Sequence, residues 1–393
     1  MNHLSLPTGS TAVDVGIIDS TARLTVPASH LLSPPTDLDG LTLTAPSYSF
    51  LIAHPSGRKI LFDLGLRKDW WNLTPATNKF LKSAGWKLEV EKNVSDILRE
   101  NGEDLDAIEA VIWSHHHFDH VGDMSTFPVS TKILVGPGFK THYMPAYPSN
   151  PTSTLLETDW ENRTLHELSF TESETQVQIG PFAAIDYFGD ASFYILDAPG
   201  HTFGHMAALA RVAADRQNPT ENSFVFMGGD TCHFAGQFRP TVGRPLPAGA
   251  SAFAFGGGGA GAEYTSEASR LNIQHQTQHQ DQVEAQAQAQ TPVAACPGSI
   301  METLLGNPTT PLFSMPATNT VDAAEAHTSI SKMQVFDAAE NVWVVIAHDQ
   351  ALLDIVDFYP ARVNDWQRRG YAQKTRWRFW NTLARKKSET KLA

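Results

Sequence analysis

Cysteine, charge and long apolar runs are all scarce in this chain of 393 residues. Its two cysteines, Cys232 and Cys296, cannot build a disulfide framework, and no CxxC pair indicates a structural zinc ribbon. No stretch approaches the ~18 consecutive apolar residues of a transmembrane helix. Residues 1–11 have neither the basic nor the apolar region of a signal peptide. We therefore expect a cytoplasmic protein that does not contact a membrane.

Charged residues make up only 18% of the chain, and the formal net charge is −13. A general nucleic-acid binder would show a basic face, so we expect no nucleic-acid partner. The hydrophobic content of 41% suffices for a large α/β core. A small molecule is the partner that these values favour, and they give no indication of the oligomeric state.

Short apolar runs, typical of buried strands, end repeatedly in loops that carry histidine or aspartate. These runs cover residues 59–62, 108–113, 193–196, 224–227 and 342–346, and they precede Asp63, His115, His201, Asp230 and His348 respectively. Loops at strand ends are where a scaffold places its chemistry. The sequence therefore predicts one site assembled from loops that are far apart along the chain.

The loop after residue 113 contains the densest cluster, with His115, His117, Asp119 and His120. Side chains at i and i+2 of an extended segment project to the same side, so His115 and His117 can bind one ion. A turn beyond them can direct Asp119 and His120 toward a second ion. Neutral imidazole and carboxylate are ligands that suit Zn²⁺, and an open coordination position makes such a site catalytic.

This cluster resembles the His-x-His-x-Asp-His signature of the metallo-β-lactamase fold superfamily, whose members are mostly zinc-dependent hydrolases. The further landmarks of that superfamily follow in the same order, with Asp63 in Phe-Asp-Leu-Gly, His201 in Pro-Gly-His-Thr, then Asp230 and His348. The resemblance covers roughly residues 45–235 and 340–355. It implies a four-layer αβ/βα sandwich with two inner β-sheets.

The resemblance also implies a ligand set for two Zn²⁺ ions. One ion would be held by His115, His117 and His201, and the other by Asp119, His120 and His348, with Asp230 bridging both. Asp63 would support the metal loop through hydrogen bonds. Flavodiiron-type relatives carry glutamate where this chain has His117, so the sequence favours hydrolysis by zinc over redox chemistry, with iron or manganese as alternatives.

Two residues are candidates for catalysis beside the metals. Asp119 can orient the nucleophile or pass on its proton. His233 stands three residues after Asp230, where acyl-homoserine lactonases of the superfamily have a substrate-contacting tyrosine, so it is a candidate donor to the substrate. We expect His116 and His205 to have packing or supporting roles and Cys232 to be a core residue.

The local sequence around the metal ligands most resembles that of the lactonase-like branch. This branch includes fungal hydrolases of lactones and lactams linked to secondary metabolism or detoxification. We therefore predict a hydrolase that opens a cyclic ester or amide. The alternatives are a thioesterase with the same two-zinc site and a noncatalytic metal-binding module. Five aromatic residues are candidates to line the substrate pocket, namely Trp70, Trp71, Phe139, Tyr143 and Tyr147.

The chain reads as one catalytic domain over residues 1–393, with two unusual segments. Residues 240–328 contain a glycine run and a tract of Gln, Ala and His, and we expect a disordered insertion there because such a composition buries little apolar area. Residues 362–393 interleave basic and aromatic residues. They indicate either a patch that binds a partner, a membrane surface or nucleic acid or, as we favour, a terminal amphipathic helix whose aromatics dock on the acidic body.

Overall fold

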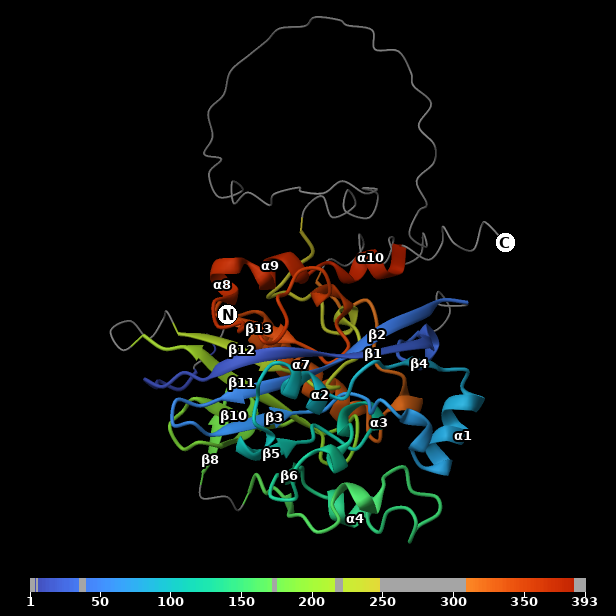
Figure 1. Cartoon of the computed structure of the whole chain (residues 1–393). Coiled ribbons are helices and arrows are strands. Elements are labelled where there is room, and N and C mark those ends of the chain that lie inside the picture. The colour runs from blue at the N-terminus through green and yellow to red at the C-terminus, as the bar shows by residue number, and fades with distance from the viewer. Residues whose placement is uncertain are drawn as a thin grey trace, which may run out of the picture.

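Two β-sheets lie face to face in the computed structural model, which describes residues 4, 6–34, 40–171, 175–215, 222–247 and 309–384 (Figure 1). The first sheet has the strand order β4 (Lys87–Glu89), β1 (Asp14–Pro27), β2 (Thr42–Ala53), β3 (Lys59–Phe62), β5 (Ile108–Ile112), β6 (Lys132–Val135) and β7 (Leu165–Glu167). The second has the order β13 (Val342–Val345), β12 (Ser223–Met227), β11 (Met206–Ala213), β10 (Phe193–Asp197), β9 (Phe182–Asp186) and β8 (Gln176–Ile179).

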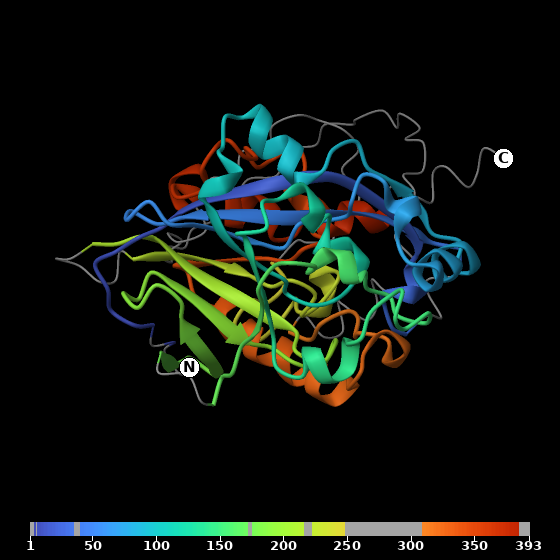
Figure 2. The same ribbon diagram turned by 60° about the horizontal axis from the view of Figure 1, so that its bottom comes forward.

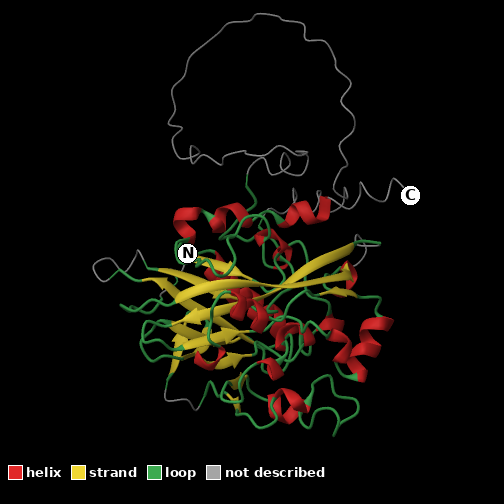
Figure 3. Ribbon diagram, viewed as in Figure 1, coloured by secondary structure: helices red, strands yellow, loops and turns green. Residues whose placement is uncertain are grey.

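Helices α2 (Val94–Glu100) and α7 (Ala323–Asp337) pack on the outer faces of the two sheets (Figures 2 and 3). The other helices in the described residues are α1 (Pro75–Ser83), α3 (Phe118–Val121), α4 (Phe139–Tyr143), α8 (Trp366–Arg369), α9 (Tyr371–Thr375) and α10 (Phe379–Ala384). Ile60 and Val225 belong to the apolar layer between the sheets, Leu61 packs in the layer shared with α2, and Phe226 in the layer shared with α7. This order of layers confirms the predicted αβ/βα sandwich.

Capping residues explain where α2 and α7 begin. At the start of α2, the carboxylate of Asp96 accepts from the backbone N–H of Asn93 at 3.1 Å, and the backbone carbonyl of Asn93 accepts from the backbone N–H of Asp96 at 3.0 Å. The carboxylate of Asp322 accepts from the backbone N–H of Glu325 at the start of α7. Both helices thereby satisfy amide groups that would otherwise be unpaired, and both present an apolar face to a sheet.

The strand directions bring the expected loops to one edge of the sandwich. β3, β5 and β6 run parallel in the first sheet, and β12 and β13 run parallel in the second. The carboxyl ends of parallel strands meet at the same edge, so the residues that follow β3 and β5 lie together, as do those that follow β12 and β13. β2 and β3 form an antiparallel pair, with Phe50 opposite Phe62.

The expected insertion ends earlier than predicted. Residues 248–308, which include the Gln-rich tract and Cys296, lie outside the described residues. Residues 309–328 are part of the folded body, because Phe313 and Met315 are buried, Ser314 pairs with Ser33, and α7 begins at Ala323. Placing the boundary at residue 328 was therefore wrong. A Pro-, Thr- and Asn-rich composition resembles a linker, but backbone hydrogen bonds fix this segment to the core.

The aromatics of the C-terminal segment are packed as we favoured. Trp366 lies in the layer between the sheets, and Phe379 and Trp380 belong to the layer that also contains α7. Trp366 belongs to the short helix α8, and Phe379 and Trp380 belong to α10, so the aromatics do not come from one terminal helix. None of the helices in the described ranges is long and apolar enough to cross a membrane.

The buried carboxylate of Asp159, in the segment between α4 and β7, predicts that the stability of the fold depends on pH. Asp159 is 3% exposed, and burial raises its pKa from 3.8 to about 7, with Arg67 opposing the shift and Asp123 adding to it. The folded chain therefore binds more protons than the unfolded chain between about pH 4 and pH 7, so this group destabilises the fold increasingly as the pH rises through that window.

We expect Asp159→Asn to raise the free energy of unfolding at pH 8 by on the order of 2 kcal/mol more than it does at pH 5. Denaturant midpoints of the wild-type protein and the variant at both pH values measure this difference. An equal effect at the two pH values would mean that Asp159 is ionised throughout and stabilised by its arginine neighbours.

Candidate metal centre

The loops after four strands place their polar side chains in one buried cluster. His115 follows β5, His201 follows β10, Asp230 follows β12 and His348 follows β13. Their exposed fractions lie between 2% and 6%. Histidine and aspartate are seldom buried together without a partner ion or a hydrogen-bond network. The predicted assembly of distant loops is therefore present in the fold.

The first group consists of His115, His117, His201 and Asp230, and one ligand atom of each lies within 4.8 Å of the others. Asp230 Oδ2 is 3.6 Å from Nε2 of both His115 and His201, and His201 Nε2 is 3.1 Å from His117 Nδ1. Ligands of a tetrahedral Zn²⁺ ion with bonds near 2.0–2.1 Å are roughly 3.3 Å apart. These separations fit one such ion without rearrangement of the loops.

The second group consists of Asp119, His120 and His348, again within 4.8 Å. His348 Nε2 is 3.6 Å from Asp119 Oδ2 and 3.0 Å from Oδ1 of Asp230. His120 Nε2 is 3.9 Å from Asp119 Oδ2 and 3.3 Å from Oδ2 of Asp230. The carboxylate of Asp230 thus contacts both groups, which is the arrangement of a bridging ligand.

Three imidazole nitrogens of the ligand groups are buried with no hydrogen-bond partner among the described residues, namely His115 Nε2, His120 Nε2 and His201 Nδ1. The first two lie within 3.6 Å of Asp230 Oδ2. Burial lowers the pKa of His115 and His201 well below the ordinary value, and that of His117 to about 3. Neutral imidazoles with unused lone pairs, directed at a shared carboxylate, are what a divalent cation requires. The donor set therefore fits two metal ions.

His120 behaves differently because it is surrounded by carboxylates. Burial alone would lower its pKa, but Asp230, Asp119 and Asp63 outweigh burial and raise that pKa well above the ordinary value. Burial disfavours the charged form of Asp230 as well, yet the neighbouring histidines hold the pKa of this carboxyl well below its usual range. In the absence of metal, a proton on His120 offsets the negative charge that cations would otherwise neutralise.

Hydrogen bonds fix the direction of the second group, as expected for Asp63. Its carboxylate accepts from the backbone N–H of Ser114 at 2.6 Å, from Ser114 Oγ at 2.8 Å and from His120 Nδ1 at 2.8 Å. His348 Nδ1 likewise donates to the carbonyl of Pro46 at 2.7 Å. Each bond occupies Nδ1 and turns Nε2 of the same ring toward the cluster.

The histidines that we expected to be supporting residues have such positions. His205 Nδ1 donates to the carbonyl of Ala198 at 2.8 Å, and its Nε2 accepts from the backbone N–H of Asp230 at 2.9 Å. Both nitrogens are thereby used, and the ring holds the Asp230 loop in place. His116 stacks on Tyr143, with 3.8 Å between ring centroids. Cys232 is a buried free thiol in the core.

His233, which the sequence suggested only as a donor to the substrate, lies directly beside the ligand groups. Its Nε2 is 3.2 Å from Asp230 Oδ2, its ring is stacked parallel to that of His348 with 5.9 Å between centroids, and it lines the cavity described next. Its backbone N–H donates to Oε1 of Gln237 at 2.7 Å, which anchors the loop. The ring therefore faces both Asp230 and the cavity.

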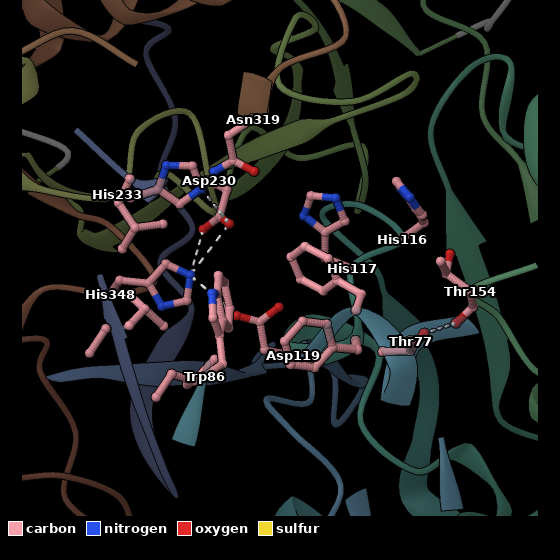
Figure 4. A pocket seen from close by; sticks show the side chains of 16 residues that line it. Thr77, Trp86, His116, His117, Asp119, Thr154, Asp230, His233, Asn319 and His348 are labelled. Carbon is pink, nitrogen blue, oxygen red and sulfur yellow. Dashed lines mark hydrogen bonds and ion pairs between the residues drawn. The ribbon is translucent and has the colours of Figure 1, made fainter. Parts of the chain in front are cut away.

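A mostly apolar cavity of about 180 Å³, open to solvent at its mouth, leads to the cluster (Figure 4). It is lined by Leu24, Val26, Leu31, Ala45, Thr77, Phe80, Trp86, His116, His117, Phe118, Asp119, Thr154, Asp230, His233, Asn319 and His348. The rings of Phe80 and Phe118 stand edge-on to that of Trp86 at 5.7 and 6.0 Å between centroids. Trp86 is held by a hydrogen bond from its Nε1 to Nδ1 of His30.

The five aromatics that we expected to line this cavity were the wrong ones, since none of them is among its lining residues. Trp71 is 62% exposed, whereas Phe139 is buried behind the first sheet. Tyr143 lies behind His116. The apolar wall comes instead from β1, from β2, from residues around α1 and from Phe118.

Sequence reasoning also missed Asn319, which lies in the segment assigned to the insertion. It lines the cavity near His233 and Asp230 (Figure 4). Two residues later, the backbone N–H of Val321 donates to the carbonyl of His201 at 3.0 Å. The strand pattern could not reveal this proximity, because it depends on contacts between segments more than a hundred residues apart.

Comparison with known proteins relates this geometry to a family. Residues 44–168 match the Metallo-beta-lactamase superfamily. A protein of Fusarium pseudograminearum (strain CS3096) named gamma-lactamase FDB1 is 39% identical over 386 residues, which cover 95% of this chain and 83% of that protein. The metallo-hydrolase mfmC of Annulohypoxylon moriforme is 37% identical over 383 residues, covering 96% of this chain and 89% of that protein.

A solved structure has the same architecture. It is an N-acyl homoserine lactone hydrolase with the product N-hexanoyl-L-homoserine bound at its catalytic metal centre. The TM-score is 0.52 and the identity 15%, with 91% of this chain and 100% of the other covered. At that identity the likeness concerns the fold alone.

Proposed function

Because this chain belongs to the metallo-beta-lactamase superfamily and is a hydrolase of that superfamily, we propose that it opens the ring of a small γ-lactam or γ-lactone. The observation that carries the proposal is the pair of ligand groups sharing Asp230 at the end of an apolar cavity. The naming of a relative as a gamma-lactamase supports a cyclic amide. The apolar wall supports a substrate whose ring carries little charge.

We propose that His115, His117 and His201 hold one ion, that Asp119, His120 and His348 hold the other, and that Asp230 bridges them. Imidazole and carboxylate ligands at tetrahedral separations favour Zn²⁺ for both positions, over iron or manganese. When bound, a pair of such ions lowers the pKa of a water molecule and polarises the carbonyl of the substrate.

The chain's own residues supply the remaining steps. Asp119 lines the cavity, so its carboxylate can take the proton of the attacking water and pass it to the ring nitrogen or oxygen that departs. His233 faces the cavity beside Asp230 and can donate a hydrogen bond to the carbonyl oxygen as negative charge develops there. Asp63, through His120, keeps the ligands in place during these changes.

A matched set of substrates tests this function. 2-Coumaranone and oxindole differ only in the ring oxygen or nitrogen of an aryl-fused five-membered ring, and an alkyl γ-lactone and an acyl thioester complete the set. We expect the zinc-loaded protein to hydrolyse at least one aryl-fused ring, and we expect a chelator to abolish this activity and added zinc to restore it.

Each other result has a distinct meaning. Turnover of the thioester alone would replace the proposal by a thioesterase. Two tightly bound metal ions per chain without turnover of any substrate would support a noncatalytic module. Metal analysis of the purified protein, made alongside the assays, decides between zinc, iron and manganese.

A further inference from the structure

Asn319 is a polar side chain of the cavity wall whose hydrogen-bonding capacity the chain itself leaves unused. It lines the cavity, and Figure 4 shows its amide pointing toward Asp230, on the side of the cavity that also holds His233. Neither atom of the amide has a hydrogen-bond partner among the described residues. Unlike the unpaired nitrogens of the ligand groups, both atoms keep accessible surface on a side chain that is partly exposed. A molecule in the cavity can therefore reach them.

The backbone fixes Asn319 at this place. The residue ends a single 3-10 turn, and the chain is anchored on both sides of that turn. Before it, Ser314 forms two backbone hydrogen bonds with Ser33, at 2.8 and 3.0 Å. After it, the backbone N–H of Val321 donates to the carbonyl of His201 at 3.0 Å. A polar group on an anchored segment is positioned before a ligand arrives, which lowers the entropy that binding costs.

The other neutral polar side chains of the cavity wall are differently placed. The lining contains two threonines beside Asn319, namely Thr77 and Thr154. The hydroxyl of Thr77 is bonded to Thr74 and to the carbonyl of Thr154. Thr154 itself lies well away from Asp230 in Figure 4. Asn319 is therefore the neutral polar side chain of the lining that stands beside the shared carboxylate with its donors and acceptor unused.

The chemistry of a carboxamide indicates what this group binds. It presents an acceptor oxygen and a donor NH2 side by side. A secondary lactam presents the complementary pair, because a five-membered ring holds its C=O and its N–H on the same edge. A nucleophile attacks the carbonyl carbon from a face of the amide plane, so this edge stays free. The carbonyl oxygen has two lone pairs, so a bond from Asn319 leaves one for His233.

A lactone does not match this carboxamide. Its ring oxygen replaces the N–H, so it cannot donate to Oδ1 of Asn319. A lactam that carries a substituent on its nitrogen has the same defect. A site that places an acceptor for an N–H group discriminates against analogues without that group, because the acceptor is left without a partner in their complexes.

We infer that Asn319 binds the edge of the scissile amide and makes the site selective for secondary γ-lactams over γ-lactones and N-substituted lactams. Nδ2 donates to the carbonyl oxygen, and Oδ1 accepts from the ring N–H. The inference rests on the proposed function and narrows it to one of its two substrate classes. Asn319 is thus a specificity-determining residue that takes no part in proton transfer.

The test compares three substrates of similar shape, namely oxindole, N-methyloxindole and 2-coumaranone. The measured quantities are the ratios of kcat/KM for oxindole to that for each of the other two. The intrinsic reactivity of each ring is the same for every variant, so a change in these ratios reports on the protein alone. Asn319→Leu has a side chain of similar size without polar atoms, and we expect it to lower both ratios about tenfold.

Two further variants separate this role from a general change of the cavity. Asn319→Asp keeps an acceptor for the N–H but loses the donor. We expect it to lower the rates with all three substrates and to keep at least the wild-type preference for oxindole. Thr154→Val is the matched control, because it removes a hydroxyl from another part of the same wall with little change in volume, and it should leave both ratios unaltered. The metal content of each variant is measured alongside.

Unchanged ratios in Asn319→Leu, with metal retained, would overturn the inference, as would an equal shift in Thr154→Val. Loss of metal in Asn319→Leu would show that the residue supports the ligand groups and would also overturn it. A wild-type protein that hydrolyses 2-coumaranone but not oxindole would refute the lactam selectivity and leave the proposed function standing. If the zinc-loaded protein hydrolyses none of the three rings, the proposed function fails and the inference fails with it.

Discussion

Replacing Asp230 with alanine should lower the metal content and remove nearly all hydrolysis. The carboxylate of this residue lies within 3.6 Å of imidazole nitrogens from both ligand groups, so its removal takes one ligand from each proposed ion. We expect fewer than two ions per chain and a fall in kcat/KM of at least about 10³-fold, because the residue serves both ions that activate the water and the carbonyl. Metal analysis after gel filtration and initial rates on the aryl-fused rings measure the two effects.

Two further variants make this result specific. Asp230→Asn preserves the shape of the side chain and one oxygen, so it should retain more metal than the alanine variant. Asp159→Asn removes a different buried carboxylate that lies outside the ligand groups, and it should keep the full metal content and rate. Turnover at the wild-type rate by Asp230→Ala would refute the assignment of the cluster as the active site.

The ligand cluster could be predicted from the sequence because its residues stand in a recognisable pattern of neighbouring residues. A histidine or aspartate within a few residues of the end of a short apolar run, as His201 and Asp230 are, has few structural reasons to be there. The parallel pairing of β3 with β5 and of β12 with β13 then brings such residues to one edge. The same pattern located five of the thirteen strands in the described residues, namely β3, β5, β10, β12 and β13.

No comparable pattern in the sequence identifies the residues of the cavity wall. Leu24 and Val26 belong to β1, whose alternating residues are typical of any half-buried strand, and Trp86 lies between α1 and β4. Their meeting depends on how the edge of the first sheet packs over the cluster. Asn319 reaches the cavity only because its segment is bonded to the His201 loop. Contacts of this kind depend on the whole fold, and local residue patterns do not encode them.

Gly200 lies where the His201 loop packs against α7. Its replacement by alanine should have the second largest effect, on both stability and metal affinity. The residue has a φ of +118°, and a Cβ atom there would lie 2.1 Å from the backbone nitrogen of Ala326 and 2.5 Å from its Cα. These are backbone atoms in the first turn of α7, so they cannot move aside as a flexible side chain can. The carbonyl of Gly200 also accepts from the backbone N–H of Asp322 at 3.0 Å, which ties the loop to the helix start.

We expect Gly200→Ala to lower the free energy of unfolding of the metal-free protein by about 3 kcal/mol or more, from the strained φ together with the clash. Since the loop must move away from α7, His201 should also leave the first ligand group, and the affinity for one of the two ions should fall at least about tenfold. Gly189→Ala is the matched control, because Gly189 has a φ of +78° but no atom within 4 Å of the added Cβ. That variant should show the backbone strain alone, about 1–2 kcal/mol, with both ions bound normally. Denaturant unfolding and metal titration of the two variants separate the backbone strain from the clash. Equal losses of unfolding free energy in both variants would mean that the loop and α7 are not rigidly packed. The position of His201 would then not depend on the helix.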